Sequence, residues 1–431
     1  NAKKAHSGIM NIVGEHATSH LKLNAPLTSD IEGLAKTVSH WVKTAYSKQE
    51  LSIYAQEAIR IANSLRGQIA TLILPGDIAW NEATVVKELK ETNFLTKINQ
   101  NKITKVANSL REAKKPLIIV GGLGLQPDTL KIIAQISEVT QSTLVTEWAN
   151  ARFDRGAGFI NVSRIPYSTD QALNFLKNFD SIILIDARPP IGFFAYPEKP
   201  GILTDPKAQI VELTDQPENL RNSVECLSDM LGAGKVRSNL IAKKSVPNIP
   251  AGKLDANSIG FVIGALLKEN SIVVDEAVTT GRQFFPATSG SPPHTWLNNC
   301  GGSIGSCLPL AVGAAIACPD RKVIALSGDG SAMYTVQSLW TIARESLDVT
   351  ILIFANRTYK ILFGELTNVG VDVPGQSAKN MLSLNSPTLE WVSLAKGMGV
   401  DALRVTTTDE FFASFQKVLG ERGPFLIELV M

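Results

Sequence analysis

The chain has 431 residues, with 42 basic and 40 acidic side chains and a formal net charge of +2. This near balance of mixed charges gives no electrostatic reason to expect nucleic acid or an anionic membrane as a partner. The longest apolar stretches, such as Leu308 to Cys318, fall far short of the ~20 residues that cross a bilayer, so we expect a soluble protein.

Four cysteines lie in the second half of the chain, at Cys226, Cys300, Cys307 and Cys318. None has the CxxC spacing that is typical of zinc sites, and their scatter gives no disulfide framework. We therefore expect reduced, mostly buried thiols in a cytoplasmic protein.

The first segment has the pattern of part of an α/β domain. Ile9 to Val13 is a strand-like apolar run that stops at Gly14, and Ile69 to Leu74 is another that stops at Pro75-Gly76. Between them, Glu50 to Leu65 has the spacing of an amphipathic helix.

Histidines in this segment invite a metal-binding hypothesis. His16 and His20 are four residues apart and can share one face of a helix as ligands. No third ligand accompanies them, so a surface or packing role is the favoured interpretation. His40, beside Trp41, is interpreted as a packing residue.

A second segment alternates helices with buried strands, which is typical of a doubly wound parallel sheet. Its turn Gly121-Gly122-Leu123-Gly124 can cradle a nucleotide, but there is no complete GxGxxG and no placed ribose-binding acid. A plain glycine turn is the favoured interpretation. We expect helices at 103–114 and 127–139 and strands at 116–120, 181–186 and 209–213.

Prolines mark a linker, Lys243 to Pro250, before the last segment. That segment opens with a helix, Asp255 to Lys268, and a strand, Ser271 to Val274, and it closes with a strand-like run, Phe425 to Val430. At ~150 residues per domain, the length predicts about three domains. The predicted fold class is α/β, with three doubly wound parallel-sheet domains at 1–95, 96–245 and 246–431.

One stretch organises the last domain. Val323 to Leu326 is predicted as a buried strand that stops at Gly328-Asp329-Gly330, and Val349 to Ala355 as a second one that stops at Asn356. Ser331 to Glu345, between them, has the apolar spacing of a helix. The two strands are therefore expected to be parallel.

Asp329 and Asn356 both lie where ligands bind in open parallel sheets, outside the carboxyl ends of the strands. The glycines beside Asp329 let the backbone approach a phosphate closely, and Ser331 is a candidate N-cap at a helix end that favours an anion. A carboxylate and an amide oxygen held side by side suit Mg2+, which prefers oxygen ligands.

Gly328-Asp329-Gly330, with Asn356 27 positions after Asp329, resembles the thiamine diphosphate motif of the acetolactate synthase and 2-oxoacid decarboxylase superfamily. The resemblance implies that Asp329, Asn356 and the backbone carbonyl of Thr358 coordinate Mg2+, which grips the cofactor diphosphate. Relatives usually have two adjacent asparagines where this chain has Ala355-Asn356. Only the second asparagine is present here, and it is the one at the ligand position.

The run from Asn298 to Ala332 extends the resemblance. It implies that Ile304 props the thiazolium ring against the pyrimidine ring, and that the carbonyl of Gly302 accepts a hydrogen bond from the pyrimidine amino group. Outside this motif, an isoleucine is more simply a core residue. The resemblance also implies cofactor contacts, chiefly to the diphosphate, from Thr279, Gly330, Ser331 and Tyr359.

The sequences Asn11 to Lys43 and Gly67 to Glu82 resemble the second half of the family's pyrimidine-binding domain. In relatives a preceding stretch supplies a glutamate that hydrogen-bonds the pyrimidine ring. Its motif is not found here, so no residue is assigned this catalytic role, and we expect an amino-terminal truncation. The middle segment resembles the central domain, which binds FAD or ADP in some relatives. Whether this chain binds FAD is left open by its sequence. The last segment resembles the diphosphate-binding domain.

Glu276 and His294 lie near the predicted site. Glu276 is interpreted as structural, because the family's cofactor base comes from the pyrimidine-binding domain. His294 can be a proton shuttle at the mouth of a pocket. As a loop histidine after Ser291-Pro292-Pro293, it is interpreted as facing solvent.

The resemblance covers nearly the whole chain. It implies an acetolactate synthase-like enzyme that uses thiamine diphosphate and Mg2+ to decarboxylate a 2-oxo acid, with ligation of the product. Tyr359 to Leu362 would present apolar side chains toward the reacting carbon, as in benzoylformate decarboxylase, which is the alternative. A non-catalytic protein that binds thiamine diphosphate or a partner subunit is the rival from another class. Family active sites form between subunits, so a homodimer or homotetramer is expected.

Overall fold

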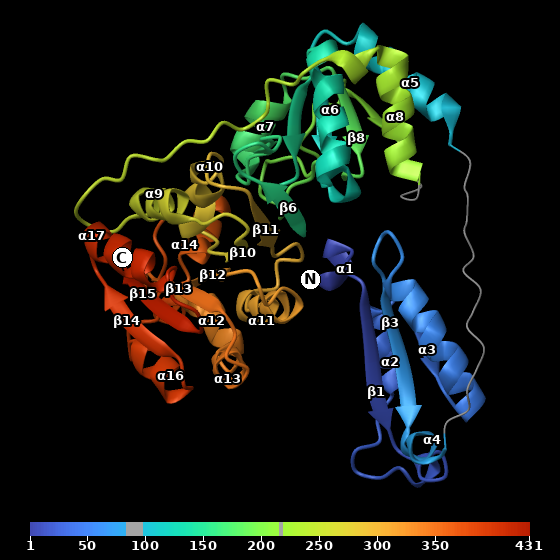
Figure 1. The fold of residues 1–431 in the computed structure, drawn as a ribbon, viewed down its shortest axis with the longest axis vertical. Coiled ribbons are helices and arrows are strands. Elements are labelled where there is room, and N and C mark those ends of the chain that lie inside the picture. Colours follow the sequence, from blue (N-terminus) through green and yellow to red (C-terminus); the bar gives the residue numbers. More distant parts are fainter. Residues whose placement is uncertain (83–97, 215–218) are drawn as a thin grey trace. The chain divides into compact units, whose positions relative to one another are not determined.

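The computed structural model describes residues 1–82, 98–214 and 219–431. They divide into two compact units, the first within Asn1–Ile98 and the second within Asn99–Asp215 and Leu220–Met431. The described residues form three sheets of three, five and seven strands, with helices between the strands (Figure 1). This confirms the predicted α/β class. None of the helices in the described ranges is long and apolar enough to cross a membrane.

The first unit is a three-stranded parallel sheet in the order β1-β3-β2. Its central strand is buried because it pairs on both sides and is packed by α3. The Ser47 hydroxyl caps that helix by accepting the Glu50 N–H at 3.2 Å. The elements are β1 (Ile9–Glu15), η1 (Leu21–Leu23), α2 (Ile31–Val38), β2 (Trp41–Thr44), α3 (Lys48–Ala62), β3 (Ile69–Pro75) and α4 (Gly76–Trp80), after a short α1 (Ala2–Ala5).

The histidines of this unit make local contacts. The rings of His16 and His20 lie with their centroids 5.4 Å apart. Nδ1 of His40 accepts the backbone N–H of Ile69 at 3.0 Å. This bond ties the entry of β2 to the entry of β3, which agrees with the packing role expected for His40.

The second unit contains a five-stranded parallel sheet in the order β7-β5-β4-β8-β9. The apolar runs of β4 and β8 are completely buried, as expected for inner strands of a parallel sheet. The elements are α5 (Gln100–Glu112), β4 (Pro116–Val120), η2 (Gly122–Leu125), α6 (Pro127–Thr140), β5 (Thr143–Thr146), β7 (Ser163–Arg164), α7 (Thr169–Leu176), β8 (Ser181–Ile185), β9 (Gln209–Glu212), α8 (Leu220–Leu231) and η4 (Ala233–Lys235).

The same unit contains a seven-stranded sheet in the order β14-β15-β13-β12-β10-β11-β6. Its strands are β6 (Arg152–Arg155), β10 (Ile272–Glu276), β11 (His294–Asn298), β12 (Val323–Gly328), β13 (Val349–Ala355), β14 (Asp401–Val405) and β15 (Phe425–Val430). Its helices are α9 (Ala256–Leu266), η5 (Thr280–Gln283), α10 (Phe284–Ala287), α11 (Cys307–Ala317), α12 (Asp329–Ala332), η6 (Met333–Thr335), α13 (Ser338–Arg344), α14 (Lys360–Asn368), α15 (Gln376–Leu382), α16 (Trp391–Gly397) and α17 (Thr408–Val418).

One edge of this sheet differs from the all-parallel expectation. β6 pairs antiparallel with β11, so that Arg155 lies opposite His294. Arg155 is buried because its guanidinium packs 3.6 Å from the centroid of the Phe285 ring and donates to the Phe285 carbonyl at 2.6 Å. A strand from the segment before the linker therefore completes the last sheet.

The helix predicted at 331–345 is interrupted. The structure has the short α12, the 3-10 turn η6 and α13 instead, and Trp340 is 54 % exposed whereas Leu339 is buried. The Thr335 hydroxyl donates to the Gly305 carbonyl at 2.7 Å, which holds η6 against a neighbouring loop. The apolar spacing does not predict this interruption, which coincides with a tertiary hydrogen bond.

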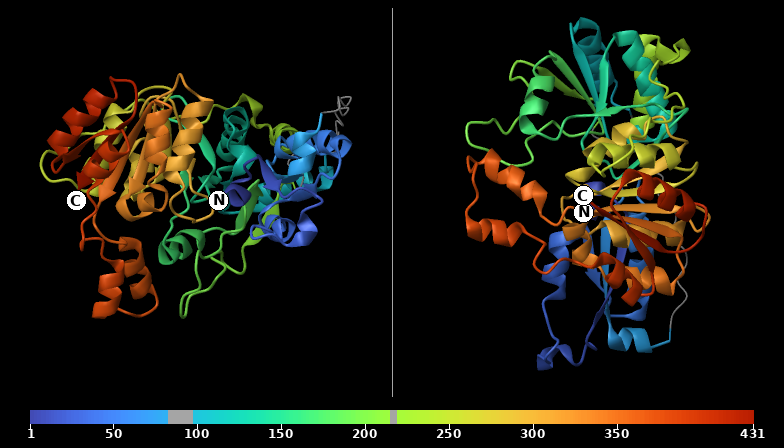
Figure 2. Two further views of the ribbon diagram at one scale, coloured as in Figure 1. Left: turned by 90° about the horizontal axis from the view of Figure 1, so that it is seen from below. Right: turned by 90° about the vertical axis from the view of Figure 1, so that its left-hand side faces the viewer.

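Helices α14 and α15 extend from the seven-stranded sheet as a short arm (Figure 2). The arm begins directly after the tip of β13. The Tyr359 N–H donates to the Leu382 carbonyl at 2.9 Å, which joins the start of the arm to its end. The arm therefore stands next to the predicted metal-binding residues.

Candidate functional site

Two strand tips meet at one edge of the seven-stranded sheet. β12 and β13 are parallel neighbours, with Gly328 opposite Phe354. Asp329 and Asn356 therefore leave the sheet from adjacent strands at the same edge. This is the placement that the sequence predicts for both residues.

The Asp329 carboxylate is 3 % exposed and is held by the main chain. Oδ1 accepts the Gly330 N–H at 2.9 Å, and Oδ2 accepts the Arg357 N–H at 2.6 Å. Burial raises the pKa of the Asp329 carboxyl, while these N–H donors oppose the rise. Each oxygen retains a lone pair, so the group can still bind a cation.

The Asn356 side chain stabilises a tight turn. Its Oδ1 accepts the Thr358 N–H at 3.0 Å, as in an Asx turn. Arg357 has a φ of 57°, a left-handed conformation that is uncommon for a residue with a side chain. The Thr358 hydroxyl donates to the Leu382 carbonyl at 2.9 Å. The turn is therefore tied both to Asp329, directly after β12, and to the end of α15.

The chemistry of the donor groups at these tips fits magnesium. A carboxylate from Asp329, an amide oxygen from Asn356 and a backbone carbonyl from Thr358 are all hard oxygen ligands. Across the residues that the structure describes, no cluster of three or more His, Cys, Asp or Glu side chains is placed to hold a metal. The ligand set proposed here contains only one such side chain, Asp329, so it does not count as a cluster of that kind. A nearby cation would offset the cost of burying the Asp329 charge.

Gly330 packs directly against Tyr359. A Cβ added to Gly330 would stand 2.5 Å from Cε1 of the Tyr359 ring, far inside normal carbon contact. A side chain here would have to displace the Tyr359 ring, so this position favours glycine. Ser331, the next residue of α12, is buried with 8 % exposure.

The loop between β11 and α11 contains Gly302 and Ile304. Gly302 has a φ of 74°, a conformation that favours glycine. The Asn299 Oδ1 accepts the N–H groups of Gly301 and Gly302 at 3.1 and 2.9 Å. These bonds fix the backbone at the position expected to meet the pyrimidine ring.

The Glu276 carboxylate accepts hydrogen bonds at the start of α11. Its Oε2 accepts the Cys307 N–H at 2.9 Å, and its Oε1 accepts the Ser306 N–H at 3.3 Å. Burial raises the pKa of the Glu276 carboxyl, and the donated hydrogen bonds oppose that rise. These hydrogen bonds agree with the structural role predicted for Glu276, because the carboxylate accepts N–H groups at the start of α11.

A cavity of about 500 Å3 adjoins these residues, and Gly302, Ile304 and Tyr359 all line it. We call it the larger cavity, because it is the larger of the two cavities that predicted site residues line. Side chains of the arm and of the segment before the linker supply much of the rest of its wall. They are Ile361, Leu362, Glu365, Met381 and Leu382, and Trp148, Arg164, Tyr167, Phe193 and Phe194.

Arg164 is a half-buried cation in the wall of the larger cavity. Its Nη2 donates to the Asn298 Oδ1 at 2.6 Å, and its guanidinium lies 3.6 Å from the centroid of the Phe285 ring. Burial lowers the pKa of Arg164 to about 10, while nearby Asp275 opposes that fall. Arg164 therefore stays cationic at neutral pH.

Asn356 and Thr358 line a smaller cavity of about 430 Å3, together with Thr280 and Lys360. The sequence pattern assigns the diphosphate contact after β10 to Thr279, which is half-buried at the start of η5. The structure places its neighbour Thr280, rather than Thr279, in the wall of the smaller cavity.

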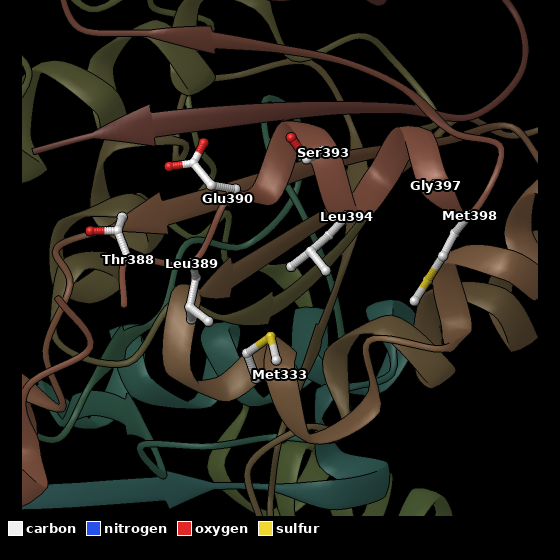
Figure 3. Close-up of a pocket in the computed structure, with 8 residues that line it drawn as sticks. All are labelled: Met333, Thr388, Leu389, Glu390, Ser393, Leu394, Gly397 and Met398. Atoms are coloured by element: carbon white, nitrogen blue, oxygen red, sulfur yellow. The ribbon is translucent and has the colours of Figure 1, made fainter. Parts of the chain in front are cut away.

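A third cavity, of about 520 Å3, lies between η6 and α16. Met333, Leu389, Leu394 and Met398 make its surface largely apolar, and Glu390 lies at its edge (Figure 3). The residues that line it include none of the predicted site residues.

The interpretation of His294 as solvent-facing is wrong. His294 begins β11 and is 4 % exposed, and its Nδ1 lies 2.8 Å from the Pro292 carbonyl. Burial lowers the pKa of His294 to about 3, with nearby Arg155 adding to the fall. The pairing of β11 with the unpredicted strand β6 covers this side chain. His294 is also not among the residues that line the larger cavity.

Sequence reasoning missed the cavity residues that precede the linker, chiefly Arg164, Tyr167 and Phe193. Arg164 ends the short strand β7, and Tyr167 and Phe193 lie in loops. All three are outside the recognisable motifs, and only the fold brings them to the loop around Gly302. The signal in the sequence that could have pointed to this region is the adjacent aromatic pair Phe193-Phe194.

The chain resembles known proteins in sequence and in fold. Residues 278–429 match the family model described as thiamine pyrophosphate enzyme, C-terminal TPP binding domain. Over 433 aligned residues, the chain is 39% identical to a Mycobacterium tuberculosis protein named as an acetolactate synthase large subunit, IlvX. The alignment covers 100% of this chain and 83% of that protein. The chain belongs to the thiamine diphosphate-dependent enzyme family.

Two further proteins align with nearly the whole of this chain. A benzoylformate decarboxylase of Pseudomonas aeruginosa is 24% identical over 100% of this chain and 83% of its own length. The solved structure of a 4-hydroxybenzoylformate decarboxylase from Rhodococcus jostii RHA1 is similar in fold, with a TM-score of 0.82 at 22% identity. That match covers 99% of this chain and 83% of the other. The predicted family is thereby confirmed.

Proposed function

We propose that this family member decarboxylates a 2-oxo acid with thiamine diphosphate and Mg2+, and ligates the product to a second carbonyl compound. The observation that carries the proposal is the hydrogen bond from the Arg357 N–H to the Asp329 Oδ2, at 2.6 Å, which locks the tips of β12 and β13 together. It holds the Asp329 carboxylate beside the turn that contains Asn356 and Thr358.

The residues named above divide the work of holding the cofactor. Asp329, Asn356 and the Thr358 carbonyl would hold Mg2+, which would in turn bind the diphosphate. Contacts from Thr279, Gly330, Ser331 and Tyr359 would complete the diphosphate site. Thiamine diphosphate, when bound, supplies the nucleophilic carbon and the electron sink for carbon–carbon bond cleavage.

The loop before α11 would orient the other end of the cofactor. The Gly302 carbonyl would accept a hydrogen bond from the pyrimidine amino group, and Ile304 would pack between the two rings. Ile361 and Leu362 line the same cavity and would keep water from the reacting carbon.

The alternative function is that of a benzoylformate decarboxylase-like enzyme, which protonates the product and releases an aldehyde. The aromatic side chains of the larger cavity favour it, since Tyr167 and Phe193 both line that space. A non-catalytic thiamine diphosphate-binding protein is the rival from another class, because no residue is assigned the role of the family glutamate.

The proposal includes an assembly. The three ranges 1–95, 96–245 and 246–431 would be the partial pyrimidine-binding, central and diphosphate-binding domains. Copies would associate as homodimers or homotetramers in the cytoplasm, where the four cysteines stay reduced; all four are free in the structure.

Turnover tests these alternatives. The protein is incubated with thiamine diphosphate, Mg2+ and either pyruvate or phenylglyoxylate, and CO2 and the organic product are measured. We expect CO2 release that EDTA abolishes, with acetolactate-type products for a ligase and aldehydes for a simple decarboxylase. Thiamine diphosphate binding without CO2 release from either acid would favour the non-catalytic rival.

A further inference from the structure

An aromatic wall lines one side of the larger cavity. We define it as Trp148, Tyr167, Phe193 and Phe194, which all lie outside the family match at 278–429. Neighbouring ring centroids are 5.3, 5.8 and 4.9 Å apart along this series. These tilted and edge-on contacts are typical of aromatic pairs, so the four rings form one continuous surface.

The aromatic wall is open to the cavity. Phe193 is 58 % exposed and Phe194 is 51 % exposed. Their loop is closed by backbone hydrogen bonds, from Gly192 to Gly201 at 2.7 Å and from Leu203 to Pro190 at 3.1 Å. Two exposed rings on an ordered loop leave apolar surface that a ligand can bury without reordering the loop.

The acids of the larger cavity already have partners. Asp275 accepts hydrogen bonds from Trp296 and Asn298, both at 3.2 Å. Glu276 serves the start of α11, and Glu365 accepts the hydroxyl of Tyr196 at 2.6 Å. These carboxylates therefore have protein donors before any ligand binds.

Arg282 provides a positive charge at the aromatic wall. Its guanidinium lies 5.5 Å from the centroid of the Tyr167 ring, and it lines the larger cavity. Among the described residues it has no carboxylate partner. An exposed cation stacked on an aromatic ring and facing a cavity suits a ligand that combines a flat ring with a negative group.

The aromatic wall also reaches the expected cofactor loop. A Cβ built on Gly302 would lie 3.2 Å from Cζ of Phe193. The Phe193 ring therefore packs over the backbone that is expected to meet the pyrimidine. A ligand on the wall would lie beside the residues assigned to the cofactor, Ile304 and Tyr359, which line the same space.

We propose that the aromatic wall and Arg282 bind an aromatic carboxylic acid, with its ring against Tyr167 and Phe193 and its carboxylate near Arg282. The further step, that the 2-oxo acid of this enzyme carries an aryl group, rests on the proposed function. The binding of an aromatic carboxylate does not rest on it.

Binding of phenylacetate tests the site without turnover. The full chain, with and without thiamine diphosphate and Mg2+, is titrated with phenylacetate, with cyclohexylacetate and with phenylacetamide. Cyclohexylacetate matches the charge but lacks the flat ring, and phenylacetamide matches the ring but lacks the charge. We expect phenylacetate to bind roughly 2- to 10-fold more tightly than cyclohexylacetate, because ring stacking adds to area burial.

Matched variants locate the binding. Phe193→Leu and Tyr167→Leu should each remove the preference for phenylacetate over cyclohexylacetate. Ile191→Ala is the control, because Ile191 is 68 % exposed on the same loop and does not line the cavity. Thermal melts of all three variants identify any that fails to fold.

Arg282→Gln should weaken the binding of phenylacetate and leave the binding of phenylacetamide unchanged. Arg152→Gln is its control, since Arg152 is 67 % exposed, pairs with Asp154 and lies outside the cavity wall. Two results would overturn the proposed binding site. One is equal affinity of the wild-type protein for phenylacetate and cyclohexylacetate. The other is unchanged phenylacetate binding in folded Phe193→Leu and Tyr167→Leu variants.

Turnover separates this inference from the proposed function. With both cofactors present, kcat/KM for phenylglyoxylate should exceed that for 2-oxobutyrate, and the folded Phe193→Leu variant should reduce the ratio. Phenylacetate binding without decarboxylation of either acid contradicts the proposed function alone. Decarboxylation without any preference for the aryl acid contradicts the aryl assignment alone.

Discussion

The backbone N–H of Arg357 donates to Oδ2 of Asp329 at 2.6 Å, across the tips of two adjacent parallel strands. Because the donor belongs to the main chain, the Asp329 carboxylate is oriented by the fold and not by a mobile side chain. The residues proposed to hold magnesium thus lie directly after the carboxyl ends of β12 and β13.

Asp329→Asn keeps the size of the side chain but removes its charge. We expect the variant to fold and to lose roughly 10- to 100-fold or more in Mg2+-dependent affinity for thiamine diphosphate, because loss of a ligand should cost at least as much as loss of a group that orients one. Isothermal titration with Mg2+ present measures the change. Asp320→Asn, at an exposed turn, is the control, and equal loss in both variants would count against the assignment.

Gly330→Ala should destabilise the protein by about 1–3 kcal/mol, because the new Cβ would overlap the Tyr359 ring. Gly313→Ala is the matched control in α11, where no atom lies within 4 Å of a new Cβ. There alanine should be neutral or stabilising by up to about 1 kcal/mol. Urea unfolding compares the two, and a neutral Gly330→Ala would show that the contact is not tight.

Glu276→Ala would leave the Cys307 and Ser306 N–H groups at the start of α11 without their acceptor. A loss of about 1–3 kcal/mol in unfolding free energy is expected for such orphaned donors. Glu276→Gln retains an acceptor oxygen and should lose less. If Ala and Gln prove equally damaging in urea titrations, charge rather than hydrogen bonding would be the main contribution.

His294 makes stability depend on pH. Its pKa is lowered to about 3 by burial, so between pH 6.5 and pH 3 the unfolded chain binds a proton that the folded chain does not. The folded state is therefore destabilised as the pH falls through that window, by about 2 kcal/mol between pH 7 and pH 5. His294→Gln should remove this part of the pH dependence. Urea titrations at both pH values check it, and parallel losses in both proteins would contradict it.

Much of this fold could be predicted because its inner strands are plain apolar runs. β4, β13 and β15 have the bounds that the sequence predicts, and glycine, proline or asparagine stops several others. The antiparallel strand β6 was not predictable, since its sequence RFDR has no apolar run and it pairs only through the folded chain. Burial of His294 was missed for the same reason.

The site divides in the same way. Asp329 and Asn356 were placed from local pattern, because glycine turns and strand ends are visible in a sequence. The aromatic wall was not, because Tyr167 and Phe193 reach Gly302 only through tertiary packing. Local signals thus indicate the residues proposed to hold the cofactor, whereas the residues proposed to select a substrate depend on contacts between distant segments.

The most direct measurement is titration of thiamine diphosphate into the wild-type chain and into Asn356→Leu, in Mg2+ and in EDTA. We predict tight binding by the wild type that depends on Mg2+, and a loss of that Mg2+ dependence in Asn356→Leu. Equal affinity of the wild type for thiamine diphosphate in Mg2+ and in EDTA would contradict the proposed magnesium site at the two strand tips. Unchanged Mg2+-dependent binding in the variant would contradict it as well.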